Sequence, residues 1–294
     1  MAWDIAVAGT VCLDDITTPH GRRENQQGGS AVYSALAASR YAPVHMVGTV
    51  GRDGLDSVLN TLRGCAVDAA GLQVSDAPTM QWWARHDFEE WNTAEERTEQ
   101  GAYDGWSPHL PEAARAAPVL FVGSMRPELQ IDVLRQSRAR VVASDSMAVY
   151  IGTRNDAVRT VAEESDILFL NRSELAGVTG RAPHDWVESA RSLCGRGRLR
   201  AVVVKGGPFG AAVVTQGSVV ERAAHPVEEV LDPTGAGDAL AGGFLGACAR
   251  AERDDEHFFP VALEEGLRCA ADAIVAFGTD ALRRRISTAH LVPD

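Results

Sequence analysis

The chain has 294 residues, 45% of them hydrophobic, which is enough to bury a sizeable core in one large α/β domain or two ordinary ones. Its 28 Lys and Arg against 40 Asp and Glu give a formal net charge of −12, which argues against a nucleic-acid or anionic-membrane partner. Five scattered cysteines form no C-x-x-C pair, and we find neither a leader-like segment nor a membrane-spanning stretch, so we expect a cytoplasmic protein without disulfides or a zinc site.

The first part of the chain begins with a buried strand and then turns polar. Residues Ile5–Ala8 form a short apolar run that is typical of a parallel strand. Asp14 and Asp15 follow in what we expect to be a loop, where Asp14 is a candidate for binding substrate hydroxyls and a turn cap is the alternative. Gly28-Gly29 opens the next helix, and two successive glycines favour the close approach of a ligand over a simple tight turn.

The stretch from Thr79 to Trp106 interrupts a rhythm of strands and helices. It combines an expected strand at 80–85 with an acidic segment that contains several tryptophans. Aromatic faces can stack on ligand rings while acidic side chains stay in water, so we interpret this insertion as a flap over a site. A surface β-excursion without a function is the alternative.

After Pro118 the alternation of strands and helices returns. Expected strands lie at 119–122, 140–143, 167–170 and 201–204, with helices at 127–136, 154–164 and 183–194 between them. This order predicts right-handed crossovers and a parallel sheet that helices cover on both faces. A hairpin at 211–223 follows, and two long helices at about 236–251 and 258–277 close the chain, with Gly278 ending the second.

The strongest chemical signal is the run Asp232-Pro-Thr-Gly-Ala-Gly-Asp238. The amides of Gly235, Ala236 and Gly237 stand where a loop becomes a helix, and unpaired amides at a helix start bind anions. Asp238 directly follows these amides and is suited to take a proton from a nucleophile that attacks the bound anion. A glycine turn before a close-packed helix would explain the glycines but not the acid.

Other nucleotide fingerprints are missing. The chain has no G-x-x-x-x-G-K-[ST], no G-x-G-x-x-G after its first strand, and neither H-R-D nor D-F-G. Phosphoryl transfer to a hydroxyl still fits the anion turn, because that reaction needs charge neutralisation and alignment. Asn171 and Glu174 could organise a hydrated Mg²⁺, although a helix capping box would explain this pair equally well.

Taken in order along the chain, five motifs resemble the ribokinase or PfkB family of sugar and nucleoside kinases. They are Gly28-Gly29, the segment 48–54 (GTVGRDG), Asn171-x-x-Glu174, Val204-Lys205-Gly206-Gly207, and the run 232–238. The resemblance implies a single ribokinase-like α/β domain over 1–294, with a doubly wound, mostly parallel central sheet flanked by helices. It also implies a small β lid formed by about 13–27 and 78–106.

The resemblance also implies a role for each matching residue. Asp238 would take the proton of the acceptor hydroxyl, and the amides of Gly235, Ala236 and Gly237 would form the anion hole. The remaining implied roles fall into three groups: Asp14, Gly28, Gly29 and Tyr33 on the acceptor side; Asn171, Glu174, Lys205, Gly207, Thr234 and Gly237 around Mg²⁺-ATP, with Glu174 reaching Mg²⁺ through water; and Asp232 with Thr234 at a monovalent cation such as K⁺. The adenine is expected near Gly207 and the segment 270–278.

One position departs from the family pattern. Tyr33 stands where sugar kinases of this family commonly have an Asn that contacts a sugar hydroxyl. We therefore expect an acceptor other than ribose or fructose phosphate: a cyclitol, an aminosugar, or a nucleoside that stacks on Tyr33, Trp82 or Trp83. Apart from Arg22, Arg23 and Arg126, no basic residues gather near the acceptor motifs, which disfavours a phosphorylated acceptor.

The sequence thus predicts a kinase that transfers the γ-phosphoryl group of ATP to a hydroxyl of a small polyhydroxylated metabolite. Its expected cofactors are ATP and Mg²⁺, with K⁺ as a candidate, and its expected partners are the acceptor and ATP, in a monomer or a homodimer. The alternative is a non-catalytic metabolite or nucleotide sensor of the same fold. A nicotinamide-dependent enzyme on a similar sheet has little support.

Overall fold

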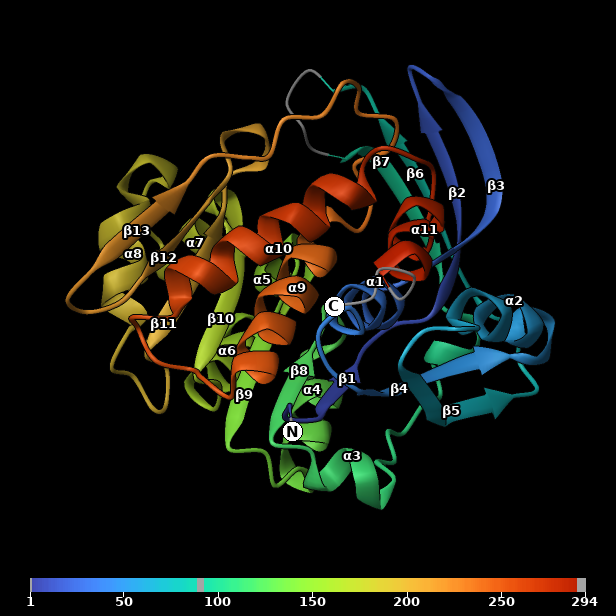
Figure 1. The fold of residues 1–294 in the computed structure, drawn as a ribbon, viewed down its shortest axis with the longest axis horizontal. Coiled ribbons are helices and arrows are strands. Elements are labelled where there is room, and N and C mark those ends of the chain that lie inside the picture. Colours follow the sequence, from blue (N-terminus) through green and yellow to red (C-terminus); the bar gives the residue numbers. More distant parts are fainter. Residues whose placement is uncertain (1, 89–92, 290–294) are drawn as a thin grey trace.

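The computed structural model describes residues 2–88 and 93–289. Its large sheet has the strand order β13-β12-β11-β10-β9-β8-β1-β4-β5 (Figure 1). The strands are β1 (Ile5–Ala8), β4 (Val44–Gly51), β5 (Val67–Ser75), β8 (Val119–Val122), β9 (Val141–Asp145), β10 (Ile167–Asn171), β11 (Ala201–Lys205), β12 (Ala211–Val214) and β13 (Val219–Arg222). Neighbours from β11 to β5 pair in parallel, whereas β12 and β13 are antiparallel. The predicted doubly wound, mostly parallel sheet is confirmed.

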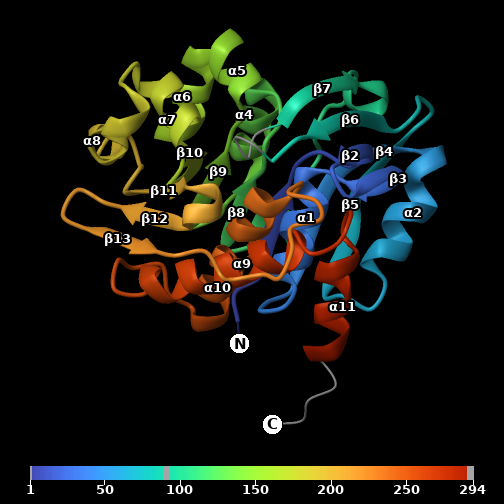
Figure 2. The ribbon, with the colours of Figure 1, turned by 90° about the horizontal axis from the view of Figure 1, so that it is seen from above.

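Helices cover both faces of this sheet, as the view from above shows (Figure 2). They are α1 (Ser30–Ala38), α2 (Arg52–Leu62), α3 (Glu112–Ala116), α4 (Pro127–Gln136), α5 (Ala148–Thr153), α6 (Asn155–Glu163), α7 (Arg172–Thr179), α8 (Trp186–Leu193), α9 (Ala236–Ala251), α10 (Phe259–Ala273) and α11 (Asp280–Ala289). Alternate residues of the central strands point to opposite faces, so Phe169 packs with α9 and α10, while Leu168 and Leu170 pack with α6 to α8. The apolar runs are buried because both faces are covered.

Small residues let α9 lie unusually close to its neighbours. A Cβ added to Gly242 would stand 2.3 Å from the carbonyl oxygen of Ser34 in α1, and one added to Gly243 would stand 2.7 Å from the sulfur of Cys269 in α10. Larger side chains at these positions would push the helices apart. The close packing holds the start of α9, where the anion turn lies, against the rest of the core.

A second, smaller sheet has the order β3-β2-β6-β7 and projects beyond one end of the large sheet (Figure 1). Its strands are β2 (Cys12–Thr18), β3 (Gly21–Gly28), β6 (Met80–His86) and β7 (Thr93–Glu99). Along β2 the residues alternate between buried and half-buried, so this sheet has one covered face and one face nearer to solvent. The predicted lid segment extends to Trp106, but Tyr103 and Trp106 pack in the core beside Leu110 and Leu120.

The structure corrects several expectations about local elements. Asp14 and Asp15 lie in β2, and the polar stretch after Pro19 forms β3, because a sheet with one solvated face needs few apolar residues. β5 and α5 were missed, and β9 extends to Asp145. The two long helices predicted at 236–251 and 258–277 are present as α9 and α10, but α10 ends at Ala273 and a further helix, α11, follows Gly278.

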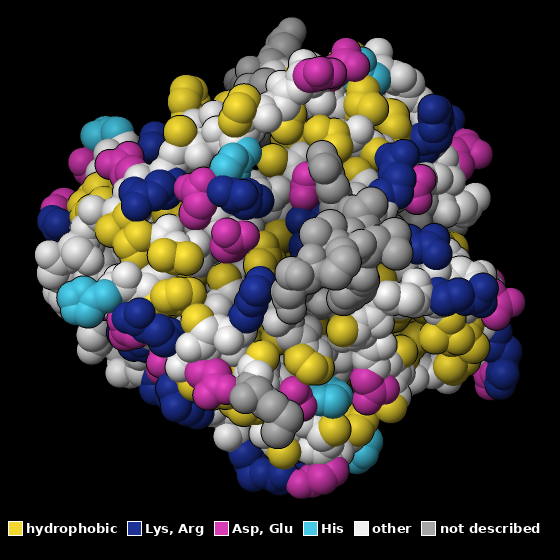
Figure 3. Space-filling model, in the orientation of Figure 1, with side chains coloured by type: hydrophobic (Ala, Val, Ile, Leu, Met, Phe, Trp, Pro, Cys, Tyr) yellow, Lys and Arg dark blue, Asp and Glu magenta, His cyan; other side chains and the backbone are white. Residues whose placement is uncertain are grey.

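Charged side chains of both signs lie on the surface. On the face shown in Figure 3, outside the atoms drawn in grey, acidic and basic side chains are interspersed and form no single basic patch. Among the described residues, no helix is both long enough and apolar enough to span a membrane.

Candidate active site

Several strands of the large sheet end in polar residues at the same edge. Asp145, Asn171 and Lys205 are the last residues of β9, β10 and β11. The strand order reverses at β1, whose neighbours are β4 on one side and β8 on the other. In open α/β sheets ligands bind outside the carboxyl ends of the strands near such a reversal, so these residues mark a candidate site.

The anion turn joins this edge at the start of α9. Gly235 caps the helix in the left-handed conformation, with φ 75° and ψ 0°, and a Cβ there would lie 2.3 Å from a ring carbon of Tyr33. Both the backbone conformation and the contact therefore require glycine. No side chain caps this first turn, and the Ala236 amide donates to the carbonyl oxygen of Pro233 at 3.3 Å, so it is already engaged. The anion-hole role of the three amides stays a prediction.

Asp238 is half-buried in the first turn of α9, and the Ser34 hydroxyl donates to its backbone carbonyl at 3.1 Å. Desolvation raises the pKa of its carboxyl to about 7; the charges of Asp145 and Glu174 add to the rise, and Lys205 opposes it. A carboxyl whose pKa lies near neutrality can exchange a proton under ordinary conditions, as a general base must.

Lys205 links the sheet edge to the anion turn. Its Nζ lies 3.0 and 2.8 Å from the two carboxylate oxygens of Asp145 and 3.8 Å from Oε2 of Glu174. A Cβ on Gly237 would be 3.4 Å from this Nζ, so the ammonium group lies directly beside the turn. The neighbouring carboxylates raise the pKa of Lys205 despite its burial, and the group stays positively charged.

Asp145 is the residue of this cluster that the sequence interpretation missed. It is buried, and its Oδ1 also accepts a hydrogen bond from the Ser146 amide at 2.7 Å. The strand expected at 140–143 stops two residues before Asp145, which is the last residue of β9. The usable signal is an acidic residue at the carboxyl end of a buried parallel strand, where ligands bind in such sheets.

Asn171 and Glu174 form the capping box that was the alternative to a metal role. Oδ1 of Asn171 accepts from the Glu174 amide at 2.8 Å, and Oε2 of Glu174 accepts from the Asn171 amide at 2.7 Å. Among the described residues, no group of three or more His, Cys, Asp or Glu side chains could hold a metal ion by itself. That donor set fits Mg²⁺ held mostly by phosphate and water, and the expected role of Glu174 at the ion stays a prediction.

Asp14 lies on the covered face of β2. A Cβ on Gly28 would be 1.8 Å from Oδ2 of Asp14, so the carboxyl group rests against the glycine backbone. The Cys12 thiol donates to Oδ1 at 3.0 Å. Burial raises the pKa of Asp14 to about 7, and nearby acids add to the rise while the thiol hydrogen bond opposes it. Asp15 points to the opposite face, where it accepts from the Asn25 amide at 2.8 Å.

The two tryptophans of β6 lie on opposite faces of the small sheet. The register pairs Trp82 with Asp14 and Trp83 with Asp15, so Trp82 shares the covered face with Asp14. The Trp82 indole N–H donates to Oε2 of Glu96 at 3.0 Å in an exposed contact. Trp83 lies on the outer face, with the Arg97 guanidinium 4.0 Å from its ring centroid.

Asp232 and Thr234, the candidate cation ligands, connect the anion turn to the loop after α10 and to β6. Oδ1 of Asp232 accepts from the Thr234 amide at 2.9 Å, and Oδ2 accepts from the Gly278 amide at 3.1 Å. Nε2 of His86 lies 3.1 Å from the Thr234 hydroxyl. Asp232 is fully buried, and the desolvation raises its pKa.

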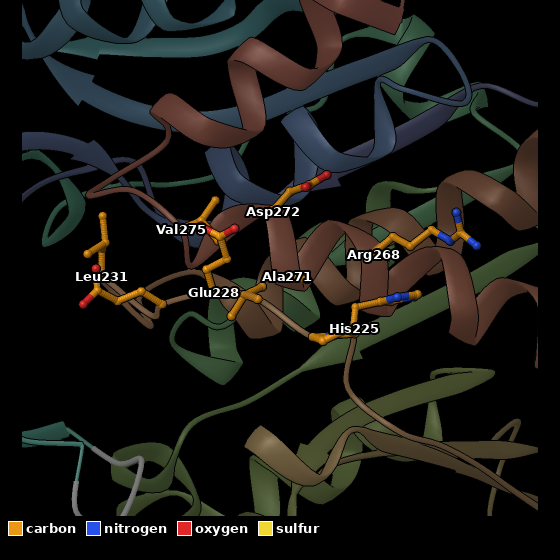
Figure 4. Close-up of a pocket in the computed structure, with 10 residues that line it drawn as sticks. His225, Glu228, Leu231, Arg268, Ala271, Asp272 and Val275 are labelled. Carbon is orange, nitrogen blue, oxygen red and sulfur yellow. The ribbon is translucent and has the colours of Figure 1, made fainter.

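A groove of about 700 Å³ lies beside this turn (Figure 4). The loop 225–231 lines one side, and Arg268, Ala271, Asp272 and Val275, in and just after α10, line the other. Ala271 and Val275 belong to the segment expected near the adenine. Gly207, the other residue of that expectation, is not among the lining residues and lies in the short 3₁₀ turn after β11.

Comparisons with known proteins bear on the family of this chain. The family described as pfkB family carbohydrate kinase matches residues 6–281. A cytidine kinase from Thermococcus kodakarensis is 31% identical over 255 residues, which cover 84% of this chain and 89% of that protein.

Solved structures share the fold at low identity. Adenosine kinase from Sinorhizobium meliloti superposes with a TM-score of 0.81 at 18% identity, covering 98% of this chain and 100% of that one. Burkholderia thailandensis nucleoside kinase in complex with inosine gives a TM-score of 0.75 at 19% identity, covering 99% and 100%. A putative ribokinase II from E. coli in complex with ATP and Mg²⁺ gives 0.78 at 18% identity, covering 98% and 99%.

Proposed function

Since the chain belongs to the pfkB family of carbohydrate kinases, we propose that it transfers the γ-phosphoryl group of ATP to a hydroxyl group of a nucleoside, with Asp238 as the general base. A kinase of this family acts with ATP and a divalent metal ion. The observation that carries the proposal is the Asp238 carboxyl, whose pKa is about 7, in the first turn of a helix that opens with a glycine turn and has no side-chain cap. A base and an anion site would then share one turn.

On the donor side, the groove beside α10 would hold the nucleotide base, and the loop from 231 to 235 leads from it to the anion turn. The Lys205 ammonium, held by Asp145 beside Gly237, would face the phosphate that the turn binds. Bound Mg²⁺ would neutralise negative charge on the phosphates, and Glu174 is the carboxylate that would hold the ion through water. Fixed positive charge at this place favours phosphoryl transfer because it needs no reorganisation.

On the acceptor side, Asp14 would accept hydrogen bonds from the ribose hydroxyls and Asp238 would remove the proton of the attacking hydroxyl. Trp82 supports a nucleoside over a simple sugar, because its indole shares the covered face with Asp14 and could stack on a base. The names of the cytidine, adenosine and nucleoside kinase relatives agree with this choice.

The three arginines that could have bound a phosphorylated acceptor are engaged elsewhere. Arg22 pairs with Glu24 at 2.7 Å, and Arg23 lies over the ring of Phe277. Arg126 donates to the backbone carbonyls of Tyr103 and Asp104 at 3.1 and 2.9 Å. These contacts support an acceptor without a phosphate group.

The small sheet would act as the lid, with its covered face over the acceptor. Three contacts join it to the loop that leads to the anion turn. The Thr18 hydroxyl donates to the Leu231 carbonyl at 3.0 Å, His20 lies 3.4 Å from Glu229, and His86 contacts Thr234. A lid docked in this way would exclude water from the transferred phosphoryl group.

The decisive experiment measures ADP formation when nucleosides, sugars and cyclitols are offered with Mg²⁺-ATP. We expect nucleosides to be the preferred acceptors. Replacing Asp238 by Asn should lower kcat by about 10²- to 10⁴-fold while ATP affinity stays close to wild type. Asp56→Asn, on the exposed side of α2, is the matched control and should leave kcat unchanged.

Two results would contradict the proposal. A near-normal kcat in Asp238→Asn would show that Asp238 is not the general base. Binding of ATP and a nucleoside without ADP formation in the wild type would instead support the non-catalytic sensor.

A monovalent cation beside Asp232 and Thr234 is a finer proposal. Each carboxylate oxygen of Asp232 accepts one backbone amide, which leaves lone pairs for a cation. If K⁺ binds there, the rate in potassium chloride should exceed the rate in tetramethylammonium chloride at equal ionic strength. Equal rates would show that K⁺ is not required.

A further inference from the structure

A pocket of about 160 Å³ between α6, α7 and α8 is lined by three arginines. Arg159 comes from α6, whereas Arg181 and Arg196 follow the ends of α7 and α8. Thr179 and Ser192 also line it, and none of its described lining residues is Asp or Glu. The three helices lie together on the face of the large sheet opposite to α9 and α10 (Figure 2). This pocket is therefore positively charged although the chain is acidic.

The three pocket arginines have no acidic partner. Within residues 2–88 and 93–289, no carboxylate forms an ion pair with Arg159, Arg181 or Arg196. Three arginines close to them in the chain each pair with a carboxylate at 2.6 to 3.0 Å: Arg154, Arg191 and Arg198. In a chain with 40 Asp and Glu against 28 Lys and Arg, unpaired arginines that share one pocket need an explanation.

Capping of the helix ends explains part of this charge. Nη2 of Arg159 donates to the Val178 carbonyl at 2.6 Å, and Nε of Arg196 donates to the Ser192 carbonyl at 2.9 Å. The side chain of Arg181 bonds to no residue that the structure describes. A helix end carries about half a negative charge, so the ends of α7 and α8 together offset about one of the three positive charges. Most of the positive charge is left for a ligand.

The remaining donors suit a phosphate group. A guanidinium has five N–H donors in a planar fork that matches two phosphate oxygens, and each capping bond uses one of them. The hydroxyls of Thr179 and Ser192 already donate to carbonyl oxygens of their own helices at 2.8 and 2.7 Å, so the arginines supply the donors. The volume lies below the roughly 300–1,000 Å³ of pockets for drug-sized ligands, which favours a small anion over a nucleotide.

We propose that this pocket is a second anion site, which binds a phosphate group, free or as the monoester of a small metabolite, through Arg159, Arg181 and Arg196. The inference goes beyond the proposed function and does not depend on it. The pocket is separate from the candidate active site because α7 lies between them. Its eight residues, at about 1.5 Å each, put about 12 Å between the capping box of Asn171 and Glu174 and the pocket.

The test measures the binding of inorganic phosphate, glycerol 3-phosphate and sulfate by titration calorimetry at constant ionic strength. Mg²⁺ and a non-hydrolysable ATP analogue are present to fill the candidate active site. Arg181→Gln removes one guanidinium that makes no described contact. Arg250→Gln is the matched control, because Arg250 is exposed in the last turn of α9, on the other face of the sheet, and the change in charge is the same.

We expect phosphate to bind the wild type, and Arg181→Gln to weaken this binding about tenfold, the loss of one hydrogen bond to a charged group. Arg250→Gln should change the affinity by less than about twofold, because salt screens a distant charge. Arg181→Lys should restore only part of the affinity, since an ammonium group lacks the planar fork. Arg181→Gln should not lower the Tm of the ligand-free protein, which confirms that the variant is folded.

Two results would overturn the inference. One is the absence of phosphate, ester and sulfate binding while the ATP analogue is bound. The other is equal phosphate affinity in Arg181→Gln and Arg250→Gln, because any bound phosphate would then lie elsewhere, such as at the anion turn.

The other outcomes distinguish the source of the phosphate group. If glycerol 3-phosphate binds as tightly as phosphate, the site takes a phosphorylated metabolite, and if phosphate and sulfate alone bind, it takes the free ion. These measurements need neither turnover nor a nucleoside. Failure of the proposed kinase reaction would therefore leave this inference standing, and failure of the inference would leave the proposed reaction untouched.

Discussion

The two sides of the site bury carboxylates beside different partners. On the donor side, Asp145 and Glu174 share the ammonium group of Lys205, which lies 2.8 and 3.8 Å from their nearest oxygens. On the acceptor side, Asp14 has a thiol for its side-chain hydrogen-bond partner, and the pKa values of Asp14 and Asp238 rise to about 7. Lys205 thus forms ion pairs with the donor-side carboxylates, whereas no cation is among the groups that shift the pKa of Asp14.

This difference matches the chemistry that each side would perform. Burial raises the pKa values of Asp145 and Glu174, Lys205 opposes that rise, and the two carboxylates hold the lysine in place, which suits the binding of a polyphosphate. Burial raises the pKa values of Asp14 and Asp238 to about 7, with Lys205 opposing the rise at Asp238, and a carboxyl that titrates near neutrality suits proton transfer from a hydroxyl. Three changes would break or sharpen the contrast.

The largest expected effect comes from removing the shared cation. Lys205→Met would leave Asp145 and Glu174 without their positive partner, and breaking a buried ion pair from one side costs about 3–5 kcal/mol of unfolding free energy. Urea unfolding checks this, and ATP turnover should fall as well.

The matched control for that change is Arg253→Met, which breaks an exposed pair with Asp255 and should change stability little. If Lys205→Met and Arg253→Met lower the free energy of unfolding equally, the buried pairing of Lys205 stabilises the protein no more than an exposed ion pair does.

A smaller effect of opposite sign is expected on the acceptor side. The folded-state pKa of Asp14 is raised from 3.8 to about 7, so between these values the native state binds more protons than the unfolded state. Its contribution to stability is therefore present at low pH and is lost as pH rises toward and above 7. Asp14→Asn stays neutral and should be more stable than the wild type by an amount on the order of 2 kcal/mol at pH 8, but equally stable near pH 4.

Urea unfolding of both proteins at pH 4.5, 6 and 8 measures this difference. Asp14→Asn should also bind the acceptor more weakly, because an amide replaces the carboxylate that would accept hydrogen bonds from the acceptor hydroxyls. A stability difference that stays constant with pH would show that Asp14 titrates normally.

The smallest effect concerns the contact between the small sheet and the donor loop. Thr18→Val removes the hydrogen bond to the Leu231 carbonyl, which is worth about 0.5–1.5 kcal/mol. If this bond helps the lid close, KM should rise a few-fold for both substrates, by roughly that energy. Thr17→Val, on the outer face of the same strand, is the control. Equal KM values in the two variants would argue against the docked lid.

Sequence patterns predicted those parts of the site that consist of residues close together in the chain. The seven residues from Asp232 to Asp238 contain a glycine turn, a helix start and an acid in one unbroken run, so the anion turn could be recognised without a fold. The apolar runs of the central strands predicted the parallel sheet for the same reason, because burial on both faces leaves a continuous pattern. Asp14 was identified as a candidate although its strand was mistaken for a loop.

Contacts between distant segments decided the rest. Whether Trp82 or Trp83 shares a face with Asp14 depends on the register of β2 and β6, which no local pattern specifies. Asp145 joins the site only because β9 and β11 end at the same edge of the sheet. Tyr33 lies under Gly235 because the glycines of α9 let α1 approach closely. The sequence by itself determined the reaction class through short-range chemistry, and only the tertiary structure decided which buried charges are paired, because burial and charge pairing depend on residues far apart in the chain.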